Sequence, residues 1–514
     1  MSLMLSVKLH ALVAQVLSWD EQSFGMDNNF IQLGGDSISA MRLASLARDK
    51  SIFLTVADIL TKDRIADLLE TDQETELEKE SEQARFALLD TTDPSAFVEE
   101  VVMSQVQSGH GKLIDVLPTT DMQSTYLRDN LHGPRRSWFY SYIDFAEILD
   151  ENRLIQSCEQ LVEHCDIYRT AFVRCGDSFF QAVFDSWRPN IDVIDGVESV
   201  EDAFDQLVGE EVKMPASLGA PLVQFKLIRE QSAKAKLVFS MSHAIYDAIS
   251  FGQTLQALAD IYHGTTPDIK DFRRYVGHIQ LHKTDSYSYW RKTLQDSSMT
   301  VLPCNSTVSA QDGPPTVLVR SVPMPKPPFG ITQASLFTLA CASTLSRLTG
   351  SLDVTLGRVV SGRATVPASL QNVVGPCLNR LPVRVQFTPG QTKTEQLAVL
   401  QKQQTESLAH ETTGLSDISK HCTDWSLDTK DFGCWIQYQN VDEEPVLGLP
   451  GALGGLGNKR MWDIPVAADF LEIFAIPSGH GMLTVRIIAG TGYADRVKAE
   501  LLEGVCAELA DIFD

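Results

Sequence analysis

The chain has 514 residues, 44% of them hydrophobic and 21% charged, which is the composition of a globular protein with several compact domains. Its formal net charge of −24 argues against nucleic acid and anionic membrane surfaces as partners, because like-signed surfaces gain nothing from releasing counterions. No secretory signal, membrane-spanning apolar run or CxxC pair occurs, so we expect a cytoplasmic protein with reduced cysteines and no metal site.

Residues 1–70 are predicted to form a small helical bundle. Apolar residues recur at helical spacing over residues 1–19, a turn-rich loop follows, and further helices are expected over residues 37–49 and 64–70. Helices this short bury only a thin core, so we expect a separate small domain.

The next segment, residues 71–111, is predicted to be a linker. Residues 71–82 hold six acidic residues, one lysine and a single aliphatic side chain, and such a stretch buries too little apolar surface to offset its ordering entropy. Asp93 and Pro94 then have the pattern of the N-cap and first position of a helix, which we expect to run to Gln107.

Residues 112–514 are predicted to be a mixed α/β region. Short β-rich runs alternate with amphipathic helices, which favours two lobes, over residues 112–285 and 286–514, with one large domain as the alternative. The expected strands are 237–241, 353–360, 383–387 and 483–488, and the expected helices are 333–348 and 494–512. The glycine-rich stretch 451–457 does not follow a strand and is predicted to be a loop.

An anion-binding helix start is predicted at Ser37. This serine follows two glycines and an aspartate in the string FIQLGGDSISAM, which covers residues 30–41. The glycines allow a tight turn, and the unpaired N–H groups and positive dipole of a helix N-terminus stabilise an anion. A serine at such a place is commonly only a helix cap, but the whole string, with a helix on either side, favours a covalent attachment site.

The string resembles the attachment site of a peptidyl carrier domain of nonribosomal peptide synthetases. The resemblance covers residues 1–70 and implies that a phosphopantetheinyl transferase places a 4′-phosphopantetheine arm on Ser37. It further implies that the thiol of this arm carries a peptidyl thioester, which upstream synthetase modules supply.

A second motif lies further along the chain. His243 and Asp247 follow a hydrophobic run and precede a helix with apolar residues at the helical spacing. The two side chains are therefore expected on a strand-to-helix loop, where catalytic groups are often placed. Taken alone, HxxxD fits a buried structural histidine and a helix-capping aspartate better than it fits a catalytic site.

Six motifs in order, including this one, resemble those of condensation domains. The motif around His243 resembles HHxxxDG. The other strings are LPTTDMQ at 117–123, HCDIYRTAF at 164–172, YW at 289–290, SGR at 361–363 and GPCLNRLPVR at 375–384. The resemblance covers roughly residues 112–490 and implies a two-lobed, V-shaped α/β fold of the chloramphenicol acetyltransferase type, with the active site in a tunnel between the lobes.

The resemblance also implies roles for these residues. An amine must attack a thioester carbonyl, and a histidine accepts a proton well near neutral pH, so His243 is implied to be the base or the group that positions the nucleophile. Asp247 is implied to be structural and to pair with a conserved arginine, which we predict to be Arg169. The alternative, a second acid–base role for Asp247, is less favoured because an arginine partner keeps a carboxylate ionised.

Two departures from the family pattern favour one branch of the family. Ser242 replaces a histidine whose family role is structural, and Ala248 replaces a glycine. The SHxxxDA form resembles the terminal condensation-like domains of fungal synthetases, such as those of the fumiquinazoline type, which release a carrier-bound peptide by cyclisation. Two alternatives remain: a condensation domain that elongates or forms an ester with an external acceptor, and a noncatalytic module that only docks carriers.

Overall fold

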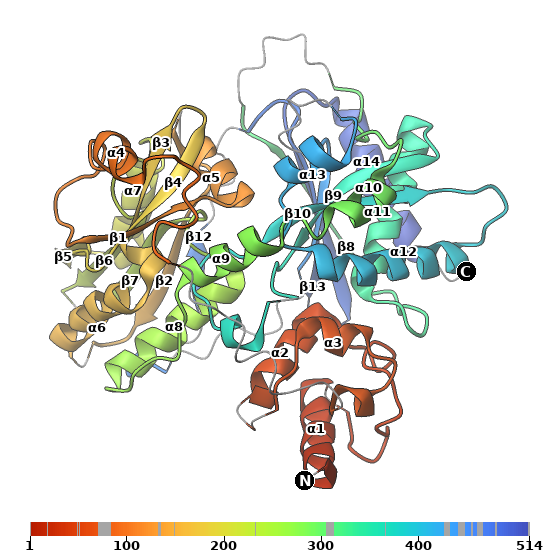
Figure 1. Ribbon diagram of the computed structural model, residues 1–514, viewed down its shortest axis with the longest axis horizontal. Helices are drawn as coiled ribbons and strands as arrows, with labels where there is room; N and C mark the ends of the chain where they lie inside the picture. The colour runs from red at the N-terminus through yellow and green to blue at the C-terminus, as the bar shows by residue number, and fades with distance from the viewer. Residues whose placement is uncertain are drawn as a thin grey trace.

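A computed structural model describes residues 2–17, 19–48, 50, 52–69, 84–131, 135–148, 150–231, 233–304, 313–364, 366–425, 432–439, 448–453, 456–459, 466–478 and 481–511. Two lobes lie side by side, and a small helical unit lies below them in Figure 1. Within these ranges, no helix is both long enough and apolar enough to cross a membrane.

The small unit is built from short helices around one apolar core. Its elements are α1 (Ser2–Leu17), α2 (Ser37–Arg48), α3 (Val56–Thr61) and a 3-10 helix (Ile65–Leu69). The helix expected over 64–70 is this 3-10 turn. The sequence did not predict α3, which is too short to show a helical period; it starts where the Thr55 side chain accepts a hydrogen bond from the Asp58 N–H at 3.0 Å.

Residues 84–111 pack on the first lobe. Asp93 caps α4 (Pro94–Phe97), as predicted, and a π-helical turn (Val98–Val102) continues it. The helix expected to reach Gln107 is shorter than predicted, because the Gln107 N–H bonds to a carbonyl of the lobe at 2.8 Å instead. The described part of the predicted linker, residues 84–111, is thus anchored on this lobe.

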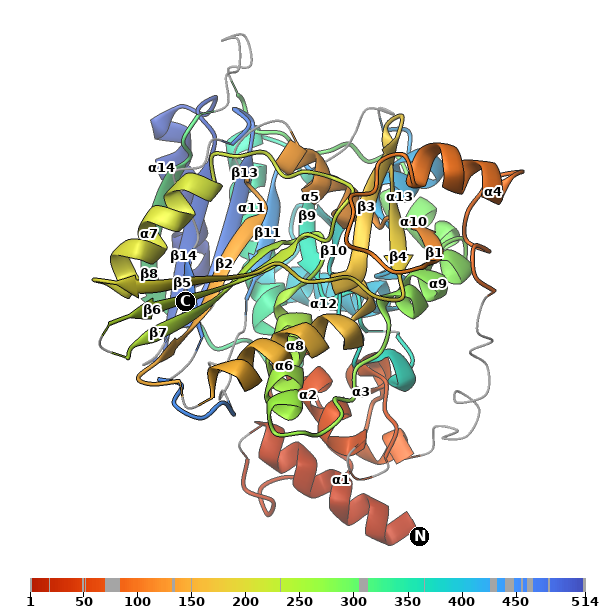
Figure 2. The same cartoon turned by 90° about the vertical axis from the view of Figure 1, so that its left-hand side faces the viewer.

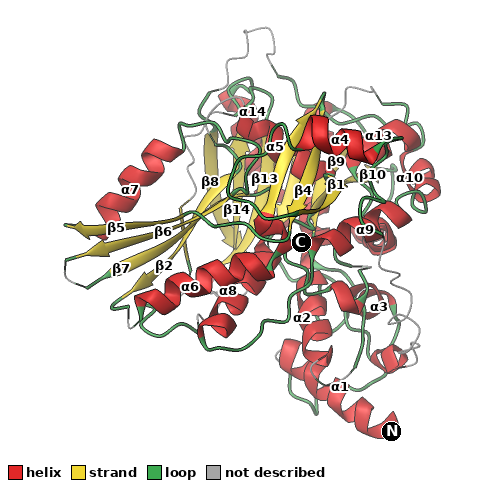
Figure 3. Ribbon diagram, turned by 60° about the vertical axis from the view of Figure 1, so that its left-hand side comes forward, coloured by secondary structure: helices red, strands yellow, loops and turns green. Residues whose placement is uncertain are grey.

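The first lobe has a smaller sheet in the order β1-β4-β3 and a larger sheet in the order β12-β2-β7-β6-β5. Its strands are β1 (Leu113–Pro118), β2 (Trp138–Phe145), β3 (Thr170–Cys175), β4 (Ser178–Phe184), β5 (Ile191–Val197), β6 (Val223–Glu230) and β7 (Ala235–Ser242). Its helices are α5 (Asp121–Leu131), α6 (Glu151–His164), α7 (Val200–Glu211), α8 (Ala248–Tyr262) and α9 (Phe272–His282). Helix α7 covers one face of the larger sheet, and α6 and α8 cover the other (Figure 2, Figure 3). Strand β7 is therefore buried along its whole length, as its apolar sequence predicts.

The second lobe contains a sheet in the order β10-β9-β11-β13-β14-β8. Its strands are β8 (Thr316–Pro323), β9 (Asp353–Val360), β10 (Asn379–Gln386), β11 (Trp435–Tyr438), β13 (Leu471–Ser478) and β14 (Met482–Ala489). Its helices are α10 (Tyr287–Leu294), α11 (Gln333–Thr349), α12 (Lys393–Ser407), α13 (Leu415–Cys422) and α14 (Asp495–Ala510). The strands and helices predicted for this part of the chain are confirmed, with ends that differ by a few residues.

One strand crosses between the lobes. Strand β12 (Gly457–Lys459) leaves the second lobe and pairs antiparallel with β2, at the edge of the first lobe's larger sheet. The prediction of a loop over 451–457 is wrong at Gly457, where a Cβ would lie 2.1 Å from the Tyr142 ring. The glycine leaves room for the Tyr142 ring of the neighbouring strand, a contact that the local sequence does not reveal. The division of the lobes at residue 285 stays a prediction, since β12 returns to the first lobe.

Candidate active site

His243 lies on the loop between β7 and α8, where the sequence places it. Its ring is stacked between those of Tyr126 and Tyr246, with ring centroids 4.8 Å apart in each pair. Nδ1 lies 2.8 Å from the Tyr246 carbonyl oxygen, which can only accept a hydrogen bond, so Nδ1 carries the proton of the neutral ring. The lone pair of the neutral imidazole is then on Nε2, which gives the ring a defined basic atom.

Ser242 ends β7 just before this histidine. Its hydroxyl is buried, lies 3.3 Å from Nδ2 of Asn130 and accepts a hydrogen bond from the Ala244 N–H at 3.2 Å. Because Asn130 belongs to α5, the hydroxyl ties the start of the loop to that helix. These contacts fit a structural role for Ser242.

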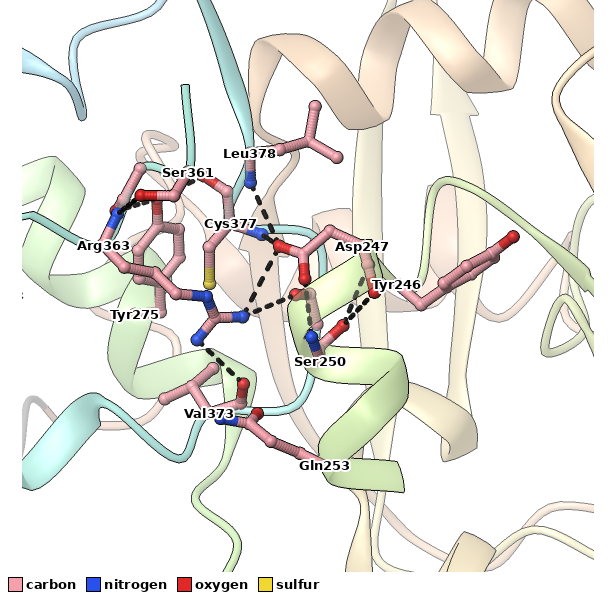
Figure 4. Close-up of polar contacts among 12 residues, drawn as sticks. Tyr246, Asp247, Ser250, Gln253, Tyr275, Ser361, Arg363, Val373, Cys377 and Leu378 are labelled. Atoms are coloured by element: carbon pink, nitrogen blue, oxygen red, sulfur yellow. Dashed lines mark hydrogen bonds and ion pairs between the residues drawn. The ribbon is translucent and has the colours of Figure 1, made fainter. Parts of the chain in front are cut away.

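Asp247 fixes the other end of the loop (Figure 4). It is the N-cap of α8, and its Oδ1 accepts a hydrogen bond from the Ser250 N–H at 2.7 Å. Its Oδ2 reaches the second lobe, where it accepts hydrogen bonds from the N–H groups of Cys377 at 2.9 Å and Leu378 at 3.3 Å. The Arg363 guanidinium lies 3.5 Å from the same oxygen. Asp247 therefore pins the loop of one lobe to the backbone of the other.

The prediction that Arg169 pairs with Asp247 is wrong. The Arg169 guanidinium donates to the backbone carbonyl of Phe184 on β4, and Arg363 takes the place beside Asp247. The Arg363 side chain is 1% exposed, so this ion pair is almost completely removed from water. The sequence contained the necessary signal in the SGR string at 361–363, but the order of motifs does not show which of two arginines folds next to the aspartate.

The segment 361–379 carries Arg363 and closes on itself. The Tyr275 hydroxyl lies 3.0 Å from the Gly362 carbonyl oxygen and 2.9 Å from that of Cys377. Gly362 has a φ of 65°, and a Cβ there would lie 1.9 Å from the Cys377 carbonyl oxygen. Only glycine fits this close approach, which accounts for its place in the SGR string.

Ser37 is the first residue of α2, at the predicted helix start. Asp36 caps this helix: its Oδ1 accepts from the Ser39 N–H at 2.8 Å, and the Asp36 N–H donates to the Ser39 hydroxyl at 2.7 Å. A Cβ on Gly35 would lie 2.3 Å from the Phe30 ring, so glycine is required in the preceding turn. The N–H groups at this helix start fit the phosphodiester of a phosphopantetheine arm.

The small helical unit contacts the second lobe directly. The Ala57 N–H of α3 donates to the Ala364 carbonyl at 2.9 Å, and the Arg48 guanidinium at the end of α2 donates to Oδ1 of Asn372 at 2.8 Å. Ala364 and Leu408 also join the hydrophobic cluster of the small unit. We refer to the surface formed by Ala364, Asn372 and Leu408 as the seat.

Glu411 lies next to the seat in the sequence and in space. Burial raises the pKa of its carboxyl to about 7, although the Arg358 guanidinium and the N–H groups of Gly362 and Ala364 lower it. Its backbone carbonyl accepts a hydrogen bond from Nδ2 of Asn379 at 2.9 Å. The sequence analysis assigned Glu411 no role, because nothing in its local pattern indicates burial.

Two protein families match this chain. Residues 114–447 match the family described as Condensation domain, and residues 7–71 match the family described as Phosphopantetheine attachment site. The chain belongs to the condensation-domain family. Its small helical unit is a carrier domain of the kind that holds a covalent 4′-phosphopantetheine, so the predicted combination of carrier and condensation domains is confirmed.

The relatives of this condensation domain are fungal nonribosomal peptide synthetases. Nonribosomal peptide synthetase ungA′ of Aspergillus campestris (strain IBT 28561) is 33% identical over 92% of this chain. The beauvericin nonribosomal cyclodepsipeptide synthetase of Beauveria bassiana is 29% identical over 96% of this chain. The chain spans only 5% and 16% of the lengths of these two relatives.

A similar solved structure is described as the crystal structure of holo T3CT. It has a TM-score of 0.72 and 26% identity to this chain, and the match covers 83% of this chain and 97% of that one. The predicted fold class, an all-α carrier followed by a two-lobed α/β condensation domain of the chloramphenicol acetyltransferase type, is confirmed by this match and the family matches.

Proposed function

We propose that this didomain releases a carrier-bound peptide by intramolecular amide formation, in which the peptide's own amine closes a ring. The observation that carries the proposal is the carrier seated on its own condensation domain, on the segment that also anchors the His243 loop. One tethered peptide can then present both reacting ends at one loop, and well-oriented intramolecular attack reaches effective molarities on the order of 10⁵–10⁸ M.

Two further observations favour cyclisation over transfer to an external acceptor. The loop has the SHxxxDA form, in which Ser242 makes structural contacts. In addition, the relative from Beauveria bassiana is a cyclodepsipeptide synthetase. Upstream synthetase modules would supply the peptide, and a phosphopantetheinyl transferase would load the carrier.

Ser37 is the attachment residue in this proposal, and the bound arm supplies the peptide as a thioester. Nε2 of His243 accepts the proton that the amine nitrogen loses as it bonds to the carbonyl carbon. The same ring then gives this proton to the sulfur as the C–S bond breaks, so the histidine is regenerated. Asp247 and Arg363 do not touch the reacting atoms and act by holding the loop.

Product masses test the proposal directly. The full chain is loaded at Ser37 with a peptidyl-pantetheine that has a free N-terminal amine, and Ser37→Ala serves as the unloaded control. A product lighter than the free acid by one water supports cyclisation. Release of linear acid alone, or a requirement for an added amine or alcohol, contradicts it and favours hydrolysis or an external acceptor.

The role of His243 has its own test. We expect His243→Ala to slow release by about 10²- to 10⁴-fold, the usual effect of losing a general base, while loading of Ser37 is unchanged. His410→Ala is the matched control, because His410 is also a partly buried, stacked histidine but lies against Tyr289 and Ser286 in the second lobe. Release at the normal rate in the His243 variant would leave this residue a structural role only.

A further inference from the structure

The segment 361–379 contacts the carrier on one side. Ala364 accepts the hydrogen bond from the carrier's Ala57 N–H, and Asn372 accepts the one from Arg48. Asn372 is itself held in place, because its Nδ2 donates to Asp268 of the first lobe at 2.9 Å. The carrier therefore docks on groups whose positions are fixed by both lobes.

The same segment contacts the catalytic loop on its other side. Arg363 precedes the carrier contact Ala364 by one residue, and Cys377 and Leu378 close the segment at its other end. All three bind Oδ2 of Asp247. Within one short stretch of chain, the residues that contact the carrier thus lie between residues that anchor the catalytic loop.

Internal hydrogen bonds make the segment a single unit. The Gln371 side chain donates to the carbonyls of Arg363 at 3.2 Å and Val366 at 2.8 Å, and the Arg363 guanidinium donates to the Val373 carbonyl at 3.1 Å. A further contact reaches α8, where Nε2 of Gln253 donates to the Gln371 carbonyl at 2.9 Å. Buried, cross-bonded groups of this kind transmit a displacement, because they have no free space in which to absorb it.

We propose that the segment 361–379 is a positioning element that couples the docking of the carrier to the anchoring of Asp247, so that the His243 loop is held most firmly when the carrier is seated. The loop's catalytic role rests on the proposed function, but the coupling does not. Coupling of this kind is reciprocal: the anchoring of Asp247 must strengthen the docking of the carrier as much as docking strengthens the anchor.

Hydrogen–deuterium exchange in the full chain tests the coupling without any turnover. Arg48→Ala removes one seat contact, and we expect exchange to rise about fivefold or more in peptides that contain the Asp247-bonded amides of Ser250, Cys377 and Leu378. Arg42→Ala is the matched control, since Arg42 is an exposed arginine on the same helix, and the described structure shows no ion pair or hydrogen bond for its side chain. Exchange in the remote strand β13 reports any general loss of stability.

The reciprocal variant completes the test. Asp247→Asn weakens the anchor, and we expect faster exchange at the carrier's Ala57 amide. The proposal is overturned if Arg48→Ala speeds exchange only in the carrier and at 364–372, or if Asp247→Asn leaves residues 55–60 of the carrier unchanged. Because neither measurement depends on peptide release, a failure of the coupling can be told apart from a failure of the proposed cyclisation.

Discussion

Asp247 and Glu411 are both buried carboxyl groups, but their surroundings differ. Asp247 faces a guanidinium and N–H donors on both of its oxygens. Glu411 also has N–H neighbours, yet its Oε2 has no hydrogen-bond partner among the described residues. The first carboxylate is therefore compensated for its loss of hydration, whereas burial dominates the second.

The first prediction concerns the ion pair of Asp247 and Arg363. Removing either partner leaves an uncompensated buried charge, so we expect Asp247→Ala and Arg363→Ala each to lower the free energy of unfolding by about 3–5 kcal/mol. The double variant should lose clearly less than the sum, as measured by urea unfolding. Arg169→Ala is the control, and its loss of stability should add to that of Asp247→Ala. If the losses of Asp247→Ala and Arg363→Ala also add to within about 0.5 kcal/mol in the double variant, the pairing is rejected.

The second prediction concerns the pH dependence that Glu411 contributes. Its folded-state pKa of about 7 lies above the ordinary value of 4.5, so between these pH values the native state keeps a proton that the unfolded state has lost. The free energy of unfolding therefore falls as pH rises from about 4.5 to about 7, by on the order of 3 kcal/mol, and is level on either side of this window.

Glu411→Gln removes this titration without changing the shape of the side chain. We expect the free energy of unfolding of this variant not to show the fall that Glu411 causes between about pH 4.5 and 7. The variant should therefore become more stable relative to the wild type as pH rises towards 7. Glu406→Gln, an exposed glutamate on α12, is the control and should follow the wild type. Parallel stability curves for the wild type and Glu411→Gln would show that Glu411 does not titrate in this range.

At the scale of elements, the segment 361–379 depends on a glycine that has two constraints. Gly362 has a positive φ and a neighbouring carbonyl oxygen in the space of a Cβ, whereas Gly350, at the end of α11, has a φ of 72° and open space around it. Alanine variants at these two positions therefore separate the energetic cost of backbone strain from that of a steric clash.

The third prediction uses this pair. Gly350→Ala should cost only the strain of a left-handed backbone, about 1 kcal/mol or slightly more. Gly362→Ala should cost several times as much and should also speed hydrogen exchange at Cys377 and Leu378, because the added methyl group collides with the Cys377 carbonyl oxygen and pushes the two ends of the segment apart. Equal losses of thermal stability in the two variants would mean that the segment relaxes around the methyl group.

Elements were predictable from the sequence where a period runs over many residues. Strand β14 shows an alternating pattern of apolar side chains, because one of its faces lies against a continuous core, whereas α11 and β9 are long apolar runs that are buried over most of their length. Strand β12 and helix α3 are too short to show any period. They form because of partners elsewhere in the chain: strand β2 for β12, and the core of the carrier for α3.

At the scale of the whole molecule, the sequence located the candidate site residues but not the contacts between them. His243 and Asp247 lie on the predicted loop because the boundary between a buried strand and an amphipathic helix is a local signal. The pairing of Asp247 with Arg363 and the seating of Arg48 on Asn372 join residues more than a hundred positions apart. Such contacts form only when complete domains pack together, and a local sequence motif does not predict them.

The strand β12 has a consequence for how the protein is made. Its partner β2 joins the sheet once β7 has been made, up to Ser242, but Lys459 leaves the ribosome only after about 220 further residues, which takes roughly 10 to 45 s at ordinary rates of synthesis. During this time the sheet of the nascent first lobe has an open edge, and open edges pair readily with other chains. We therefore expect newly made chains to need protection, by chaperones or by sparse spacing of ribosomes, until the last part of the second lobe has folded back.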